Sequence, residues 1–322
     1  MALRLIAASK TDVGKQREQN EDNCYTQIIE DDRRASGLFI VADGMGGYHA
    51  GEVASKIAVQ TVRDALQSVL GPTSSQPTMP LNRTRGRDKG ARVTHKLPSV
   101  DGKEGKEGKE GKEGESNSSA SDAAESPASH SAQATKALTE SVALEHYSDL
   151  LRIAIEQSSE KIVEYGEEHK EARGLGSTIT AALVVEGQAF IANVGDSRTY
   201  LLRDGKLTRI TSDHSLVERL VQSGQIDRDD VYDHPSRNLI YRSLGAGRAE
   251  VDVDIFTERL QPGDALLLCS DGLWEMVRDP QLTNILSEVD DLSETVDLLI
   301  QRANENGGED NITAVLVRGI AG

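Results

Sequence analysis

The chain has 322 residues, of which 28% are charged and 37% hydrophobic, and its formal net charge is −17. The excess of 53 acidic over 36 basic residues argues against nucleic acid or an anionic membrane as the main partner. Its two cysteines, Cys24 and Cys269, have no metal-finger spacing, and no apolar run approaches the roughly 18 residues that span a membrane. We therefore expect a cytoplasmic protein that binds neither nucleic acid nor membrane.

The first part of the chain is expected to form three strands and a helix, at residues 3–8, 24–29, 38–42 and 52–70. Asp43 follows the third strand directly, and a turn rich in glycine begins at Gly44. Glycine lets the backbone approach a ligand closely, so a cation could lie beside Asp43. An Asp-Gly pair after a strand can equally be an ordinary turn.

Residues 71–135 have the composition of a disordered insertion, with four Gly-Lys-Glu triplets from Gly102 and a run rich in Ser and Ala. A role in docking a partner is the alternative. A second helix is expected over 137–165, with an apolar stripe as wide as that of the first helix. The two helices should pack side by side, which makes residues 1–322 a single domain interrupted by the insertion.

The last half of the chain is expected to consist mainly of strands, followed by two helices. Polar residues 212–238 separate a strand meander from further strands at 239–244 and 251–256, and we expect them to form a mobile surface flap. An apolar strand then ends at Asp271-Gly272. Helices should follow at 280–288 and 292–304, and Asp310 precedes a final strand.

Four aspartates thus stand at strand ends or in adjacent turns: Asp22, Asp43, Asp271 and Asp310. Clustered carboxylates repel one another unless cations neutralise them. Sites made only of oxygen ligands suit Mg²⁺ or Mn²⁺ rather than zinc or copper. The sequence therefore predicts a centre for a hard divalent metal.

Seven segments resemble, in order, motifs of the metal-dependent protein phosphatases of the 2C type, in their compact bacterial form. These segments are R-E-Q-N-E-D-N (17–23), V-A-D-G-M-G-G (41–47), G-L-G-S-T (174–178), N-V-G-D-S-R (193–198), N-L-I-Y-R-S-L-G (238–245), L-L-C-S-D-G-L-W (267–274) and G-G-E-D-N-I-T (307–313). The resemblance implies an α+β fold. Two antiparallel sheets, flanked by antiparallel helix pairs, would form a four-layer α-β-β-α sandwich.

The resemblance also implies a site that holds two Mn²⁺ or Mg²⁺ ions. Asp43 would bridge the two ions, and Gly44 would supply a carbonyl oxygen to one of them. The remaining ligands would be Asp271 and Asp310, with Asp22 binding directly or through water. Asp196 matches the position that helps to hold a third, weaker metal in bacterial relatives, although it could instead be a turn residue that caps its own loop.

The activity implied is hydrolysis of phosphoserine and phosphothreonine in proteins, the targets of a serine/threonine kinase, by a water or hydroxide that bridges the two metals. Arg17 would bind the substrate phosphate, because a guanidinium meets two phosphoryl oxygens at once. We expect the enzyme to be a monomer. The alternatives are a phosphoprotein-binding module with little or no turnover, and an enzyme acting on an anti-sigma-factor antagonist.

The general acid is left open by the sequence. Some relatives carry a histidine two residues after the bridging aspartate, and this chain has Met45 there. His49 and His214 are the histidines near matched motifs, and a metal-bound water is the preferred candidate.

Overall fold

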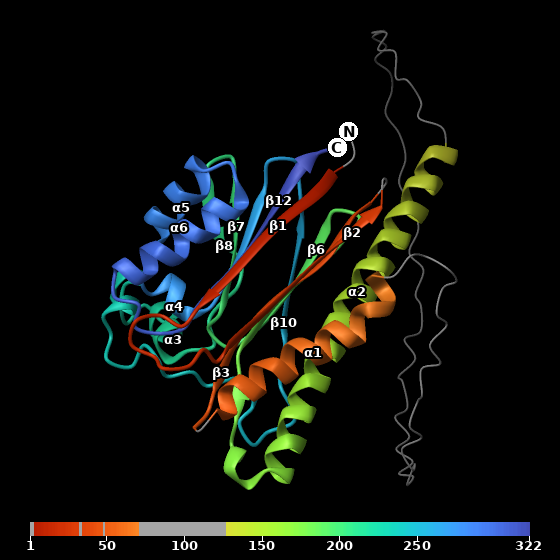
Figure 1. Ribbon diagram of the computed structural model, residues 1–322. Helices are drawn as coiled ribbons and strands as arrows, with labels where there is room; N and C mark the ends of the chain where they lie inside the picture. Colours follow the sequence, from red (N-terminus) through yellow and green to blue (C-terminus); the bar gives the residue numbers. More distant parts are fainter. Residues whose placement is uncertain (1–2, 32–33, 48, 71–126) are drawn as a thin grey trace, which may run out of the picture. The chain divides into compact units, whose positions relative to one another are not determined.

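The computed structural model describes residues 3–31, 34–47, 49–70 and 127–322 (Figure 1). By its internal contacts the chain divides into one unit made of Met1–Thr73 with Thr139–Gly322 and a second unit, Ser74–Leu138. In the second unit only the helical residues 127–138 are described. The account that follows is of the first unit.

Two antiparallel sheets form the centre of this unit (Figure 1). The five-stranded sheet has the order β1-β12-β11-β7-β8, with β1 at Leu3–Asp12, β12 at Ile312–Ala321, β11 at Ala265–Cys269, β7 at Arg198–Arg203 and β8 at Lys206–Arg209. The other sheet has the order β10-β6-β5-β3-β4-β9, and β2 also pairs with β3. Its strands are β2 (Asp22–Asp31), β3 (Arg34–Met45), β4 (Gly176–Ser177), β5 (Ile179–Val185), β6 (Gln188–Val194), β9 (Leu244–Gly245) and β10 (Asp254–Arg259).

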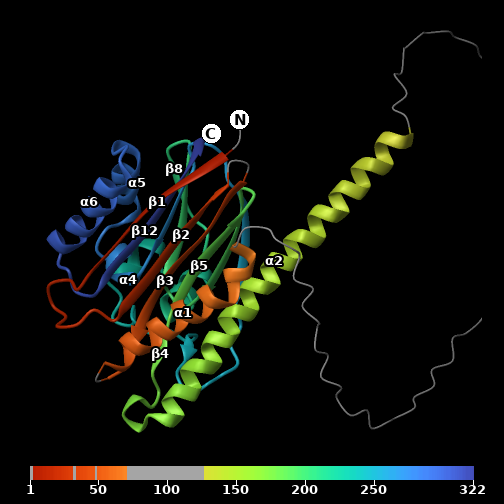
Figure 2. The same ribbon diagram turned by 45° about the vertical axis from the view of Figure 1, so that its right-hand side comes forward.

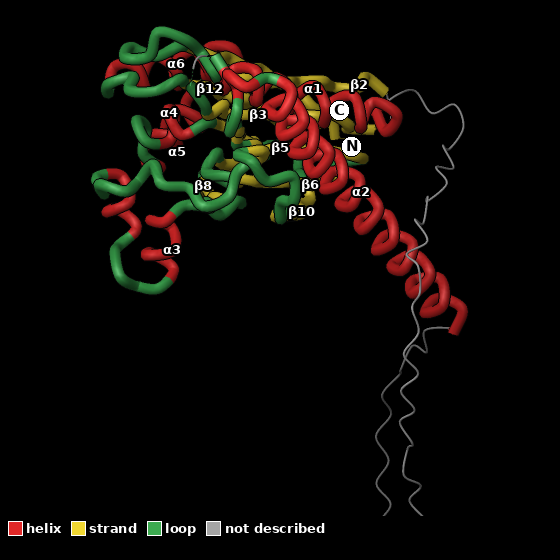
Figure 3. The backbone as a smooth tube through the Cα atoms, turned by 90° about the horizontal axis from the view of Figure 1, so that it is seen from below, coloured by secondary structure: helices red, strands yellow, loops and turns green. Residues whose placement is uncertain are grey.

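Helices cover the outer face of each sheet (Figure 2). Helix α1 (Ala50–Leu70) and residues 147–165 of α2 (Pro127–Glu168) pack on the sheet that contains β3, whereas α5 (Asp279–Glu288) and α6 (Leu292–Glu305) pack on the five-stranded sheet. The short helices are η1 (Lys170–Ala172), α3 (Leu216–Gln222), η2 (Arg228–Tyr232) and α4 (Asp271–Trp274). In Figure 3, α3 and the loops on either side of it lie outside the layer of strands.

Period-two alternation along the strands explains these four layers. In β3, Leu38 and Ile40 belong to the core beneath α1 and α2, whereas Phe39 and Val41 belong to the core between the two sheets. In β12, likewise, Leu316 faces α5 and α6 while its neighbours face the other sheet. Each buried strand must be apolar on both faces, which is how both sequences read. The predicted four-layer α-β-β-α sandwich is confirmed.

Several predicted boundaries were wrong. Helix α2 begins at Pro127 and so covers the last residues of the expected insertion at 71–135, while residues 71–126 lie outside the described part of the chain. The strand expected over 239–244 is reduced to β9 and to one isolated bridge between Ser215 and Ile240. Strand β10 starts three residues later than expected, at Asp254.

No helix within the described ranges is both long enough and apolar enough to cross a membrane.

Candidate metal centre and active site

A cavity of about 250 Å³ opens where β3, the loop before β2, α4 and the loop before β12 meet. Its lining is polar and contains every predicted site residue except Asp22. The lining residues are Arg17, Glu21, Asp43, Gly44, Met45, Gly46, Thr178, Asp196, Asn238, Ile240, Asp271, Asp310 and Asn311. Asp22 lies beside Asp43, because the two are register partners in the β2–β3 pair.

Strand β3 holds Asp43 in place through its backbone. Contrary to the expectation that the strand stops at Asp43, β3 continues to Met45, because β4 pairs with Gly44 and Met45. The Asp43 carbonyl accepts hydrogen bonds from the Thr178 amide at 2.8 Å and from the Ser177 hydroxyl at 2.9 Å. Fixed in this way, the Asp43 side chain is directed from a rigid strand rather than from a loose turn.

Gly44 fills a position that no larger residue could take. A Cβ atom added there would lie 2.0 Å from the Gly51 carbonyl oxygen at the start of α1 and 2.7 Å from the Glu21 carbonyl oxygen. The Gly44 amide donates to that same Glu21 oxygen at 3.2 Å. Glycine is therefore required for close packing of three backbone segments at the cavity wall.

Two buried carboxylate oxygens at this site have no hydrogen-bond partner among the described residues: Oδ1 of Asp22 and Oδ1 of Asp271. The other oxygen of Asp22 accepts from the Ser270 hydroxyl at 2.7 Å. A buried acceptor without a partner is costly, and buried oxygens of this kind are commonly ligands of an ion. The donor set, made of oxygens only, fits Mg²⁺ or Mn²⁺.

The carboxylates also raise one another's pKa. Burial, together with the neighbouring acids, raises the pKa of Asp22 to about 8 and that of Asp271 to about 6. The pKa values of Asp43 and Asp196 are raised well above the usual range for the same reasons. Like charges close together disfavour ionisation of each carboxyl group. Among the described residues, no set of three or more His, Cys, Asp or Glu side chains is arranged so that it could hold an ion as it stands.

Among the described residues that line the cavity, only Arg17 carries a guanidinium. Its Nη2 atom donates to Oδ2 of Asp310 at 2.6 Å, and 53% of its side chain is exposed. Burial works against the charge, but the hydrogen bond and the charge of Asp310 raise the pKa of Arg17 above its ordinary value. The structure thus places a permanent positive charge beside the acidic cluster and accessible to an incoming anion.

Sequence reasoning missed Asn311, which fixes the loop that carries Arg17. Its side-chain amide donates to the carbonyls of Val13 at 3.0 Å and Gln19 at 2.8 Å, and its Oδ1 accepts from the Glu21 amide at 2.8 Å. The available signal was its position in the matched segment G-G-E-D-N-I-T, directly after Asp310.

Neither histidine considered as a general acid lines the cavity. His214 is buried, and its Nδ1 accepts from the Gly195 amide at 3.0 Å while its Nε2 lies 3.1 Å from a carboxylate oxygen of Asp254. Burial lowers the pKa of His214. The His49 ring contacts the Gln19 side chain at 3.0 Å. The geometry therefore leaves His214 with a structural role.

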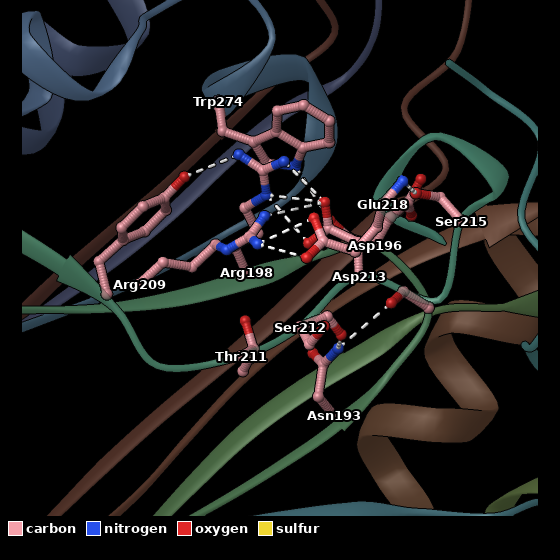
Figure 4. A network of polar contacts seen from close by, with 12 residues as sticks. Asn193, Asp196, Arg198, Arg209, Thr211, Ser212, Asp213, Ser215, Glu218 and Trp274 are labelled. Carbon is pink, nitrogen blue, oxygen red and sulfur yellow. Dashed lines mark hydrogen bonds and ion pairs between the residues drawn. The ribbon is translucent and has the colours of Figure 1, made fainter. Parts of the chain in front are cut away.

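A buried ionic network joins the start of the expected flap to the site (Figure 4). Arg198 donates to Asp213 from Nη2 at 2.6 Å and from Nε at 3.0 Å, and its guanidinium lies 3.4 Å from the centre of the Trp274 ring. The Trp274 indole N–H donates to the Asp196 carbonyl at 3.0 Å. Because Asp213 is 1% exposed, the beginning of the 212–238 segment is core rather than surface, contrary to expectation.

Comparison with known proteins decides the family. Residues 13–317 match the family described as Protein phosphatase 2C. The chain belongs to this family. It is accordingly a protein serine/threonine phosphatase by class, as the seven motifs predicted.

Individual relatives agree with this placement. The serine/threonine phosphatase stp of Listeria welshimeri is 34% identical over 311 residues, which cover 97% of this chain and 94% of that protein. The crystal structure of Stp1 from Staphylococcus aureus has a TM-score of 0.67 and 30% identity, covering 100% of this chain and 98% of that one. A solved PstP catalytic domain in complex with two manganese ions has a TM-score of 0.66 and 27% identity, covering 99% and 100% of the two chains.

Proposed function

We propose that this 2C-family phosphatase hydrolyses phosphoserine and phosphothreonine in proteins at the cavity that contains Asp43. The observation that carries the proposal is the pair of buried, unpartnered carboxylate oxygens, on Asp22 and Asp271, beside a cavity that also holds Arg17. When bound, two Mn²⁺ or Mg²⁺ ions would supply Lewis-acid activation of the attacking water. The same family membership favours an enzyme over a binding module without turnover.

The side chains of this chain would divide the work between ion binding and phosphate binding. Asp43, Asp271 and Asp310 would hold the two ions, with Gly44 contributing a carbonyl oxygen and Asp22 binding directly or through water. Asp196, whose pKa is also raised by burial and by neighbouring acids, would help to hold a third ion. All of these groups except Asp22 line the cavity, and Asp22 pairs with Asp43.

Arg17 would bind and orient the phosphoryl group. A guanidinium offers two parallel donors to phosphoryl oxygens. In the structure it is bound to Asp310. If Asp310 binds a metal ion instead, Arg17 would be free to donate its hydrogen bonds to the phosphate. The proton for the departing serine or threonine oxygen is assigned to water, because neither His49 nor His214 lines the cavity.

The natural substrates would be phosphoproteins made by a serine/threonine kinase, and we propose that the enzyme acts as a cytoplasmic monomer. We also propose that residues 1–322 form one phosphatase domain with an insertion between α1 and α2. The matched family region, 13–317, extends across that insertion and supports this organisation.

The test is hydrolysis of a phosphothreonine peptide with Mn²⁺, with Mg²⁺ and with EDTA, for wild type and Asp43→Asn. Activity should need metal and should vanish in Asp43→Asn. Asp204→Asn is a matched control, because Asp204 is exposed in the β7–β8 turn at φ +50°, a conformation that asparagine also tolerates. Full activity of folded Asp43→Asn, or metal-independent activity of wild type, would contradict the proposal.

A further inference from the structure

Residues 238–241 form part of the cavity wall and also carry exposed apolar side chains. Asn238 and Ile240 line the cavity. The two residues that alternate with them, Leu239 and Tyr241, are 57% and 48% exposed. The segment therefore has one side toward the candidate active site and another toward solvent.

This segment pairs with the residues that precede α3. Ser215 and Ile240 form an antiparallel bridge, the Leu216 amide donates to the Leu239 carbonyl at 2.8 Å, and the Tyr241 amide donates to the His214 carbonyl at 2.9 Å. Leu216, the first residue of α3, is thus joined to Leu239 by a backbone hydrogen bond. Leu216 is 39% exposed. We call Leu216, Leu239 and Tyr241 the apolar rim.

Within the apolar rim, the Tyr241 side chain contacts two neighbouring side chains. The Tyr241 ring lies 5.9 Å from the buried His214 ring, and the Arg219 guanidinium lies over the Tyr241 ring, 5.3 Å from the ring centre. Other exposed large apolar side chains in the described ranges lie on β1 and α2, none of them in the lining of this cavity. Scattered apolar residues need no explanation, but a cluster beside an active site is typical of a binding surface.

We propose that the apolar rim binds an apolar side chain of the substrate, close in sequence to the phosphorylated serine or threonine. The inference rests on the proposed function. Apart from Met45, Ile240 and two glycines, the residues that line the cavity are polar or charged, so the cavity can hold the phosphoryl group but offers few contacts to a neighbouring apolar side chain. A phosphorylated residue that reaches the cavity carries its neighbours across the wall formed by residues 238–241. There the apolar rim is continuous with the cavity wall.

The proposal predicts a preference among substrates. The test compares two phosphothreonine peptides. They differ only at the residues that flank phosphothreonine, which are leucine in one peptide and serine in the other. Wild type should hydrolyse the leucine peptide with a kcat/KM about tenfold higher, at the low end expected for an apolar contact on a partly exposed surface. The readout is the ratio of the two kcat/KM values, because general damage to the site lowers both alike and cancels.

Three variants locate the preference. In Leu239→Ser/Tyr241→Ser the ratio should fall close to one, whereas Leu239→Met, which keeps an apolar side chain, should retain it. Ile153→Ser is the matched control, because Ile153 is 48% exposed on α2 and does not line the cavity. It should keep the wild-type ratio.

Several results would overturn the inference. These are a wild-type ratio near one, a double variant that keeps the wild-type ratio, and a loss of the ratio in Ile153→Ser. A dimer in sedimentation that dissociates in the double variant would instead assign the rim to a second copy of the chain. Failure of the proposed function is distinguishable, since wild type would then hydrolyse neither peptide, nor a small aryl phosphate, with Mn²⁺.

Discussion

Replacing Arg198 with methionine should destabilise the protein strongly, because it would leave the Asp213 carboxylate buried without its main partner. The two side chains are 4% and 1% exposed, and three hydrogen bonds of 2.6 to 3.1 Å join them. Although burial opposes the charge, Asp213 raises the pKa of Arg198 well above its usual value. Removing one partner of such a pair costs about 3–5 kcal/mol.

The structure favours the lower end of that range. Nη1 of Arg209 lies 3.3 Å from Oδ2 of Asp213, an oxygen that Arg198 also contacts, and would partly compensate the charge of Asp213. We therefore expect a loss of about 3 kcal/mol. At about 2–4 °C per kcal/mol for a domain of this size, Tm should fall by about 6–12 °C. Arg152→Met, which breaks an exposed pair with Asp149, should cost less than about 1 kcal/mol.

A double-mutant cycle tests the cause. Melting of Arg198→Met, Asp213→Leu and the double variant is followed by circular dichroism in EDTA, so that metal binding does not contribute. The double variant should be more stable than the sum of the two single losses predicts, because it leaves no unpaired buried charge. Additive losses, or a fall in Tm of less than about 2 °C for Arg198→Met, would refute the reasoning.

Three further outcomes follow from the site. Asp271→Asn should abolish metal-dependent turnover with an unchanged far-ultraviolet spectrum, and retained activity would remove Asp271 from the metal site. In EDTA, the free energy of unfolding measured in urea should fall as pH rises from about 4 to 8. The pKa values of Asp271, about 6, and Asp22, about 8, lie above the ordinary 3.8, so in this range the folded state binds more protons than the unfolded state. This slope should flatten in Asp22→Asn, and an unaltered slope would contradict the assignment. Arg17→Ala should raise KM for a phosphopeptide about tenfold with a smaller change in kcat, as expected for loss of a charged hydrogen bond to phosphate; an unchanged KM would exclude that role.

The sequence by itself determined the layers of the fold and most members of the candidate site. The continuous apolar run around Phe39 and the apolar stripe of α1 are local features: the run predicts a strand buried on both faces, and the stripe shows which face of the helix is buried. The ordered motifs likewise identified the family, and the residues that line the cavity all lie in the seven matched segments. These features could be predicted because each is carried by a short stretch of chain.

Only the tertiary structure decided which partner each polar group has. It carried β3 past Asp43 by pairing it with β4, more than 130 residues later in the chain, and it gave Asn311 its contacts with the loop before β2. It also placed the apolar residues around Leu239, which were predicted to form a strand, in an exposed rim beside the cavity. The physical reason is that hydrophobic spacing constrains a segment's own conformation, whereas burial and hydrogen-bond partners depend on segments that are distant in sequence.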